Sequence, residues 1–144
     1  MARINWRRVA VSGLLWAAVY SIVGGIAMLL FLGREFIAEL ERLGRPLALD
    51  RESLISLGLF GIVFTLAWGV IAMWFYAAIR PRYGPGPRTA IIAAIGVWLL
   101  TIAAPVSHLA AFGMASSRFV MFDLPTELVA IIAATVAGAW LYKE

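Results

Sequence analysis

The sequence predicts an all-α membrane protein, an antiparallel bundle of four transmembrane helices in one domain that covers residues 1–144. Two observations support this prediction. Hydrophobic residues make up 63% of the chain and charged residues 14%, whereas a soluble domain is about 45–50% apolar and about 25% charged. The apolar residues are also gathered in four runs of about 20 residues or more, the length that a helix needs to cross a bilayer.

We expect the four spans at about residues 9–32, 54–79, 89–112 and 119–142, with an outer loop over 33–53 and a turn over 80–88. Arginines precede the first run, as in a signal peptide. However, the run is longer than the apolar segment of a signal peptide, which has about 7–15 residues. We therefore expect the first run to be retained as a transmembrane helix.

The basic residues predict the orientation of the chain. Arg80, Arg82 and Arg88 lie in the turn between the second and third runs, and acidic residues are concentrated in the outer loop. By the positive-inside rule, this arrangement predicts that both termini lie in the cytoplasm. The same three arginines are suited to contact anionic lipid headgroups, at about 1 kcal/mol for each basic residue near the surface.

The first helix is expected to continue beyond the membrane as an amphipathic segment. Its apolar stripe consists of Leu32, Phe36, Leu40 and Leu43. Gly44 and Pro46 then supply a typical helix end. This segment either projects from the bilayer or lies on its surface, where it covers the mouth of the bundle or docks a partner.

Prolines and caps set the expected limits of the other helices. The second helix should follow an N-cap at Asp50 and end at Arg80, since the next residue is a proline. Pro105 should kink the third helix, because it removes one backbone hydrogen bond. Pro125 leaves two alternatives for the fourth helix. The helix either begins near Asp123, or it begins earlier and bends at the proline.

Small residues at i, i+4 spacing line three of the four predicted spans. Such rows form grooves in which membrane helices approach closely. The rows consist of Gly13, Ala17, Ser21 and Gly25 in the first span, Gly61, Thr65 and Gly69 in the second, and Ala130, Ala134 and Gly138 in the fourth. They predict a tight bundle, packed within one chain or also against another copy.

Several aromatic and hydroxyl side chains lie deep in the predicted spans. They are Trp16, Tyr20, Thr65, Trp68, Trp98 and Thr101. Indole and phenol groups need a hydrogen-bond partner when they are buried. These residues therefore either line an internal cavity or fill the core.

Ionisable side chains inside a span are costly and therefore indicate function. The candidates are His108, Asp123 and Glu127. If the fourth helix begins near Asp123, His108 and Glu127 lie at similar depth and form a polar pocket that is open to the periplasm. This pocket would bind a proton, a cation or a polar headgroup. The alternative is structural, with Asp123 as an N-cap, Glu127 favoured by the helix dipole and His108 reaching water.

Other classes of site are not indicated. The chain has no cysteine and one histidine, which excludes disulfides, thiolate metal sites and a bis-histidine haem within one subunit. We find no acidic residue at the centre of a predicted span and no catalytic constellation. We therefore expect no enzymatic activity, no cofactor, no metal site and no nucleic-acid partner.

Two stretches, WFYAAIRPRYGPGPRTA (74–90) and AGAWLYKE (137–144), resemble a group of short bacterial four-span membrane proteins with no assigned function. This resemblance implies a four-helix fold in the bacterial inner membrane and supplies no site residues.

For the function, we expect a non-catalytic subunit or scaffold that packs with itself or with a larger membrane complex. One alternative is a small transporter or channel with a pocket at His108 and Glu127. Another is a lipid- or pigment-binding subunit in which His108 is a single axial ligand.

Overall fold

The computed structural model describes residues 4–44 and 51–142. These residues form helices joined by turns, and no β-strand occurs among them. Four helical stretches are long and apolar enough to cross a membrane, namely Trp6–Arg42, Arg51–Tyr83, Pro87–Ala111 and Ser117–Leu141. The predicted all-α bundle of four spans is therefore confirmed, and the protein is a multi-pass membrane protein.

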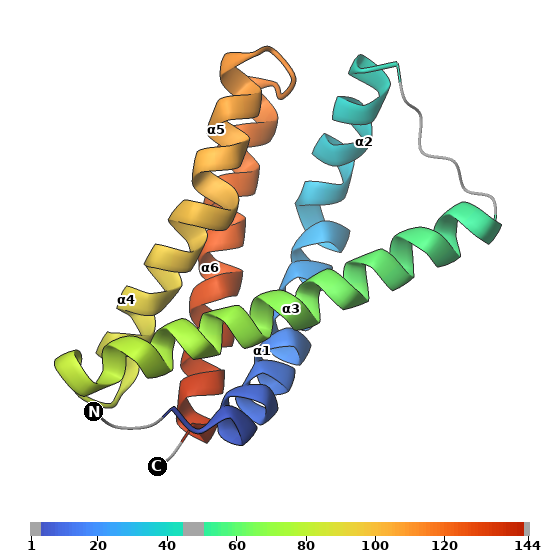
Figure 1. The fold of residues 1–144 in the computed structure, drawn as a ribbon. Coiled ribbons are helices and arrows are strands. Elements are labelled where there is room, and N and C mark those ends of the chain that lie inside the picture. Colours follow the sequence, from blue (N-terminus) through green and yellow to red (C-terminus); the bar gives the residue numbers. More distant parts are fainter. Residues whose placement is uncertain (1–3, 45–50, 143–144) are drawn as a thin grey trace.

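The first span consists of α1 (Trp6–Ala27), the π-helical turn η1 (Met28–Leu32) and α2 (Gly33–Arg42), and the second is α3 (Arg51–Tyr83). The third consists of α4 (Pro87–Trp98), the π-helical turn η2 (Leu99–Ala103) and α5 (Ala104–Ala111), and the fourth is α6 (Ser117–Leu141). α6 packs between α1 and α4, and α3 lies obliquely across them (Figure 1).

The bundle has two ends that differ in their connections (Figure 1). At the end that we call the turn end, α1 begins, α3 turns into α4, and α6 ends. At the opposite end, called the loop end, lie α2 and the loop that joins α5 to α6. Because the chain crosses the bundle four times, α1 begins and α6 ends on the same side.

The first span extends beyond the bilayer, in agreement with its amphipathic pattern. Trp6–Arg42 has 37 residues and is therefore about 55 Å long, whereas the hydrocarbon core is about 30 Å thick. Gly33 follows η1. A Cβ atom added to Gly33 would lie 2.6 Å from the carbonyl oxygen of Met28. The helix ends as predicted before Gly44, which has a φ of 65°, and Pro46 lies outside the described residues.

The second helix continues past the proline that was expected to end it. α3 includes Pro81 and ends at Tyr83, so the expected end at Arg80 was wrong. Pro81 lacks an N–H, but in the last turn this removes a single hydrogen bond, and Gly84 N still donates to Arg80 O at 2.8 Å. The expected N-cap Asp50 lies outside the described residues.

The prolines of the third and fourth spans also lie within helices. The chain is π-helical over Leu99–Ala103, directly before Pro105, so the expected disturbance takes the form of a wider helical turn. α6 begins at Ser117 and contains Pro125, which selects the earlier start for the fourth helix. Its N-cap is Ser116, whose hydroxyl oxygen accepts a hydrogen bond from Phe119 N at 3.2 Å.

Small residues bring three helices together near the turn end. A Cβ atom on Gly69 of α3 would overlap the carbonyl oxygen of Gly13 on α1, and one on Gly138 of α6 would lie 2.5 Å from Met73 Sδ. The largest fully buried side chains surround these crossings and include Val9, Trp16, Met73, Tyr76, Ile131 and Tyr142. Ala17, Ala130 and Ala134 are buried as well, so the predicted tight packing is present in this half.

The rows of small residues are open toward the loop end. Ser21, Gly25 and Gly61 are exposed, and a Cβ atom on either glycine would meet nothing within 4 Å. The chain therefore fills its predicted grooves near the turn end and leaves their continuations uncovered.

α3 diverges from the other helices toward its first residue (Figure 1). Residues 53–79 have no charged side chain and form about 40 Å of helix, which fits a hydrocarbon core of about 30 Å at a tilt of about 40°. All of residues 51–64 are exposed. The excess length of α3 explains its tilt, and the tilt carries its first turns away from the bundle.

Replacing Gly69 with alanine should destabilise the protein, because the added methyl group meets the backbone of Gly13 and not a flexible side chain. Overpacking of this kind costs about 1–3 kcal/mol. We expect a lower melting temperature for Gly69→Ala in mild detergent, followed by circular dichroism. Gly25→Ala is the matched control, since its methyl group enters open space. Equal melting temperatures would contradict the close crossing of α1 and α3.

Candidate functional site

Two acidic side chains lie within the membrane-spanning part of α6. Because α6 begins at Ser117, Glu127 is ten residues from its start, about 15 Å along the axis. Glu127 is therefore near the middle of the span, where we expected no acidic residue, and it is not in the first turn. Asp123 lies one turn closer to the loop end and is not an N-cap, since Ser116 has that role.

Glu127 is held by a tyrosine from the neighbouring helix. The Tyr20 hydroxyl donates a hydrogen bond to Glu127 Oε2 at 2.6 Å. The Tyr20 ring stacks on Trp16, with ring centroids 4.9 Å apart and an angle of 11° between the planes. The Trp16 Nε1–H donates in turn to Thr135 Oγ1 at 2.9 Å. These contacts join α1 to α6 and connect Thr135 in the core to Glu127.

Asp123 is more deeply buried than Glu127 and has fewer partners. It is 9% exposed and close enough for its charge to act on both Glu127 and Tyr20. Within residues 4–44 and 51–142, neither carboxylate forms an ion pair with a basic side chain, and Asp123 has no hydrogen bond. Insertion of an acidic side chain at the centre of a span costs about 2.5–3.5 kcal/mol, so this pair is an expensive feature.

His108 lies apart from this pair in depth. It is exposed and three residues from the end of α5, about 5 Å from that end. Its ring contacts Phe112, with centroids 5.6 Å apart. The similar depth expected for His108 and Glu127 depended on a fourth helix that begins near Asp123, and α6 begins earlier. Among the described residues no group of three or more histidine, cysteine or acidic side chains could hold a metal ion.

The other deep polar and aromatic side chains mostly satisfy their hydrogen-bonding groups within the bundle. Trp98 Nε1–H donates to Leu124 O at 3.0 Å, and Thr101 Oγ1 donates to Val97 O at 2.8 Å. Trp68 is half-buried and meets Phe64 edge to face, with centroids 6.3 Å apart. Thr65 instead lines a cavity of about 250 Å³ between α1 and α3.

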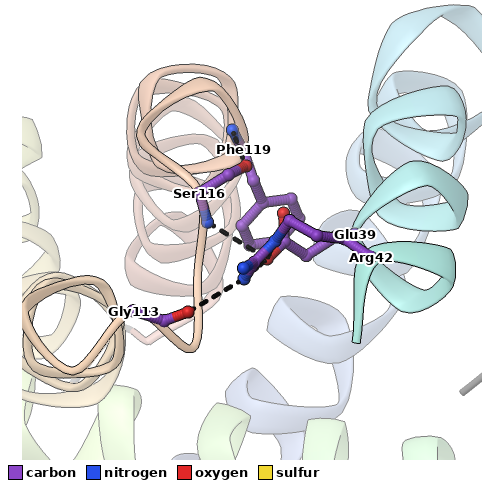
Figure 2. A network of polar contacts seen from close by, with 5 residues as sticks. All are labelled: Glu39, Arg42, Gly113, Ser116 and Phe119. Carbon is purple, nitrogen blue, oxygen red and sulfur yellow. Dashed lines mark hydrogen bonds and ion pairs between the residues drawn. The ribbon is translucent and has the colours of Figure 1, made fainter. Parts of the chain in front are cut away.

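A second polar cluster joins the helices at the loop end (Figure 2). Glu39 of α2 is buried, and its Oε1 accepts hydrogen bonds from Arg42 Nε and from Ser116 N, both at 3.0 Å. Arg42 also donates to Gly113 O at 3.1 Å. α2 is thereby fastened to the loop between α5 and α6, and the amphipathic extension stands upright beside the bundle (Figure 1).

A neighbouring ion pair strengthens this attachment. Arg118 Nη2 of α6 lies 2.8 Å from Glu35 Oε1 of α2. Glu39 was not among the predicted site residues and was one of several acids in the outer loop. Its spacing of three residues from Arg42 was the available signal, but its contact with Ser116 depends on the fold.

Hydrogen bonding determines the charge of Glu39. Because Glu39 is level with the α5–α6 loop, it lies beyond the ends of the third and fourth spans (Figure 2). Hydrogen bonds from Arg42 and Ser116 lower the pKa of its carboxyl below the usual value, since they favour the charged form. The contribution of Glu39 to stability is therefore complete above its ordinary pKa and is lost as the pH falls through the lowered value.

The arginine-rich turn at the opposite end is partly engaged by the protein itself. The Arg80 guanidinium lies over the Tyr142 ring, 5.6 Å from its centroid. Arg82 and Arg88 are exposed. Thr89 Oγ1 donates to Gly84 O at 2.7 Å and fixes the turn. Two of the three arginines that were predicted to contact lipid headgroups are thus exposed.

Comparison with known proteins does not assign the chain to a family. No protein-family model matches it, and neither a curated protein nor a solved structure is significantly similar.

Glu39→Ala should release α2 from the α5–α6 loop. Hydrogen bonds to a charged group contribute about 1.5–3 kcal/mol, so amide hydrogen exchange over residues 33–42 should become about ten- to a hundredfold faster. Wild-type protein at acidic pH should show the same loss of protection relative to the intrinsic exchange rate at that pH. Glu41→Ala is the matched control, because Glu41 is exposed on the same helix. Unchanged exchange in Glu39→Ala would show that this cluster does not hold α2.

Thr135→Val should destabilise the protein by about 1–3 kcal/mol, because it leaves the buried Trp16 N–H without an acceptor. Thr101→Val is the control, since that hydroxyl bonds only to its own helix backbone. Thermal unfolding of the two variants, and of each combined with Trp16→Phe, gives the interaction energy. Additive effects of Trp16→Phe and Thr135→Val would contradict the bond.

Proposed function

We propose that this protein is a non-catalytic subunit of the bacterial inner membrane that assembles with a second copy of itself. The observation that carries the proposal is the exposure of every residue from 51 to 64 in α3. Each of the other spans buries residues in its loop-end half, such as Leu32, Ala103 and Asp123. The first half of α3 is the one long membrane-spanning stretch, within the described part of the chain, in which every residue is exposed.

The divergence of α3 from α1 creates a notch that suits a helix. A cavity of about 250 Å³ lies where the two helices separate, and Ser21, Ile62 and Thr65 are among its lining residues. The small residues that continue these faces, Gly25 and Gly61, are also uncovered. Membrane helices associate by close packing at such small residues, since lipid supplies no hydrophobic driving force.

A second copy is the partner that this surface fits best. The exposed half of α3 has no charged side chain after Glu52, so two copies can face each other without burying a charge. In a dimer with its two-fold axis along the membrane normal, the two α3 helices meet at equivalent residues. Small residues on both helices then allow the backbones to approach.

The charged residues suggest how the dimer is oriented. The exposed Arg82 and Arg88 lie at the turn end, beside the starts of α1 and α4 and the end of α6. The positive-inside rule supports a cytoplasmic location for this end, where the two arginines meet anionic headgroups. The α2 extension and the α5–α6 loop then lie in the periplasm.

Cysteine cross-linking in native membranes tests the assembly, because the chain has no cysteine of its own. Ile62→Cys should form a disulfide-linked dimer on mild oxidation, since Ile62 faces the notch. Phe60→Cys should not, although Phe60 and Ile62 are 62% and 60% exposed, because they point in nearly opposite directions on the helix.

A monomeric mass for the wild-type protein in mild detergent, together with no cross-link at Ile62→Cys, would overturn the proposal. Equal cross-linking at both positions would indicate random collision and would also count against it.

A further inference from the structure

We propose that Asp123 and Glu127 form a proton-binding site between α1 and α6, in which Tyr20 positions Glu127. This inference does not depend on the assembly of the protein. It rests on the pair of carboxyl groups one turn apart on α6, the interhelical hydrogen bond at 2.6 Å, and the lack of a hydrogen-bond or ion-pair partner for Asp123 among the described residues.

The carboxyl pair lacks a basic partner at membrane depth. Residues 9–32, 53–79 and 89–111 contain no lysine, arginine or acidic residue, and their titratable side chains are Tyr20, Tyr76 and His108. Tyr76 is buried in the core near the turn end, and His108 lies near the end of α5. Only Tyr20 of α1 faces the pair, and Trp98 contacts α6 from α4.

A proton is the positive charge that this site can accommodate. Calcium takes six to eight oxygen ligands and magnesium about six, whereas the site offers two carboxyl groups and one phenol oxygen. A proton needs one lone pair, and two neighbouring carboxylates in a low-dielectric environment favour holding it between them. Asp123 forms no hydrogen bond with any described residue, and its carboxyl oxygens are not among the fully buried polar atoms, so they keep vacant and accessible lone pairs.

Tyr20 fixes the geometry of the site. Its ring cannot swing freely, because it is stacked on Trp16, which is anchored to Thr135. The hydroxyl is therefore presented to Glu127 Oε2, and its donated hydrogen bond favours the ionised form of that carboxyl. Tyr20 is a positioning residue that tunes how tightly the proton is held.

The shorter path from the pair to the end of the span leads to the loop end. Asp123 lies closer to that end than Glu127, about 9 Å from the start of α6. We therefore place the exchange of the proton on the side of α2 and the α5–α6 loop.

Infrared spectroscopy of the whole protein in lipid vesicles tests the site, because a protonated carboxyl has a C=O band that an ionised one lacks. Wild-type protein should show such a band, which shifts in deuterium oxide and disappears as the pH rises. Asp123→Asn with Glu127→Gln should remove it, whereas Glu41→Gln, at an exposed position, should leave it unchanged.

Tyr20→Phe provides a second test with the same infrared band, in a protein that keeps both carboxyl groups. Without the phenol donor, the affinity of the pair for the proton should change by about tenfold, so the pH midpoint of the band should move by about one unit. Three results would overturn the proposal: wild-type protein lacks the carboxyl band, the double variant keeps it, or the pH midpoint of the band moves with sodium concentration. The third result would identify a cation site instead.

Discussion

The close crossing of α1, α3 and α6 near the turn end is the constraint on which the rest of the structure depends. At this point the backbones of Gly13 and Gly69 touch, and Gly138 brings α6 against Met73. Membrane helices gain little by burying apolar surface from lipid, so close packing at small residues must hold them together. Because the three helices are fixed here, the tilt of α3 about this crossing determines how far its other half lies from the bundle.

The number and class of the helices were predictable from the sequence, whereas their detailed limits were not. Long apolar runs identify spans because hydrocarbon cannot satisfy an exposed backbone. Proline is a weaker signal in a membrane than in water, since the neighbouring protein and local π turns compensate the lost bond. Pro125 therefore lies inside α6, whereas Pro81 lies in the last turn of α3, where it removes a single hydrogen bond.

The sequence predicted the candidate site only in part, because the limits of α6 could not be predicted. Asp123 and Glu127 were visible as unusual residues, but their depth depended on where α6 begins. Both Ser116 and Asp123 are suitable N-caps, and the sequence does not choose between them. The choice moves Glu127 from the first turn of a helix to the middle of a span. Its partner Tyr20 was expected to need a hydrogen bond, but pairing across 107 positions depends on the fold.

α1 connects the two surfaces to which we assign functions. Tyr20 faces α6 and binds Glu127, while the next residue, Ser21, lines the notch toward α3. A helix seated in the notch therefore contacts α1 one residue away from the side chain that positions the acidic pair. Near the turn end, α1 is immobilised by the crossing at Gly13, and beyond Ala27 it passes into the π turn η1. The acidic pair thus lies between a closely packed half of the bundle and a half whose packing within the chain is incomplete.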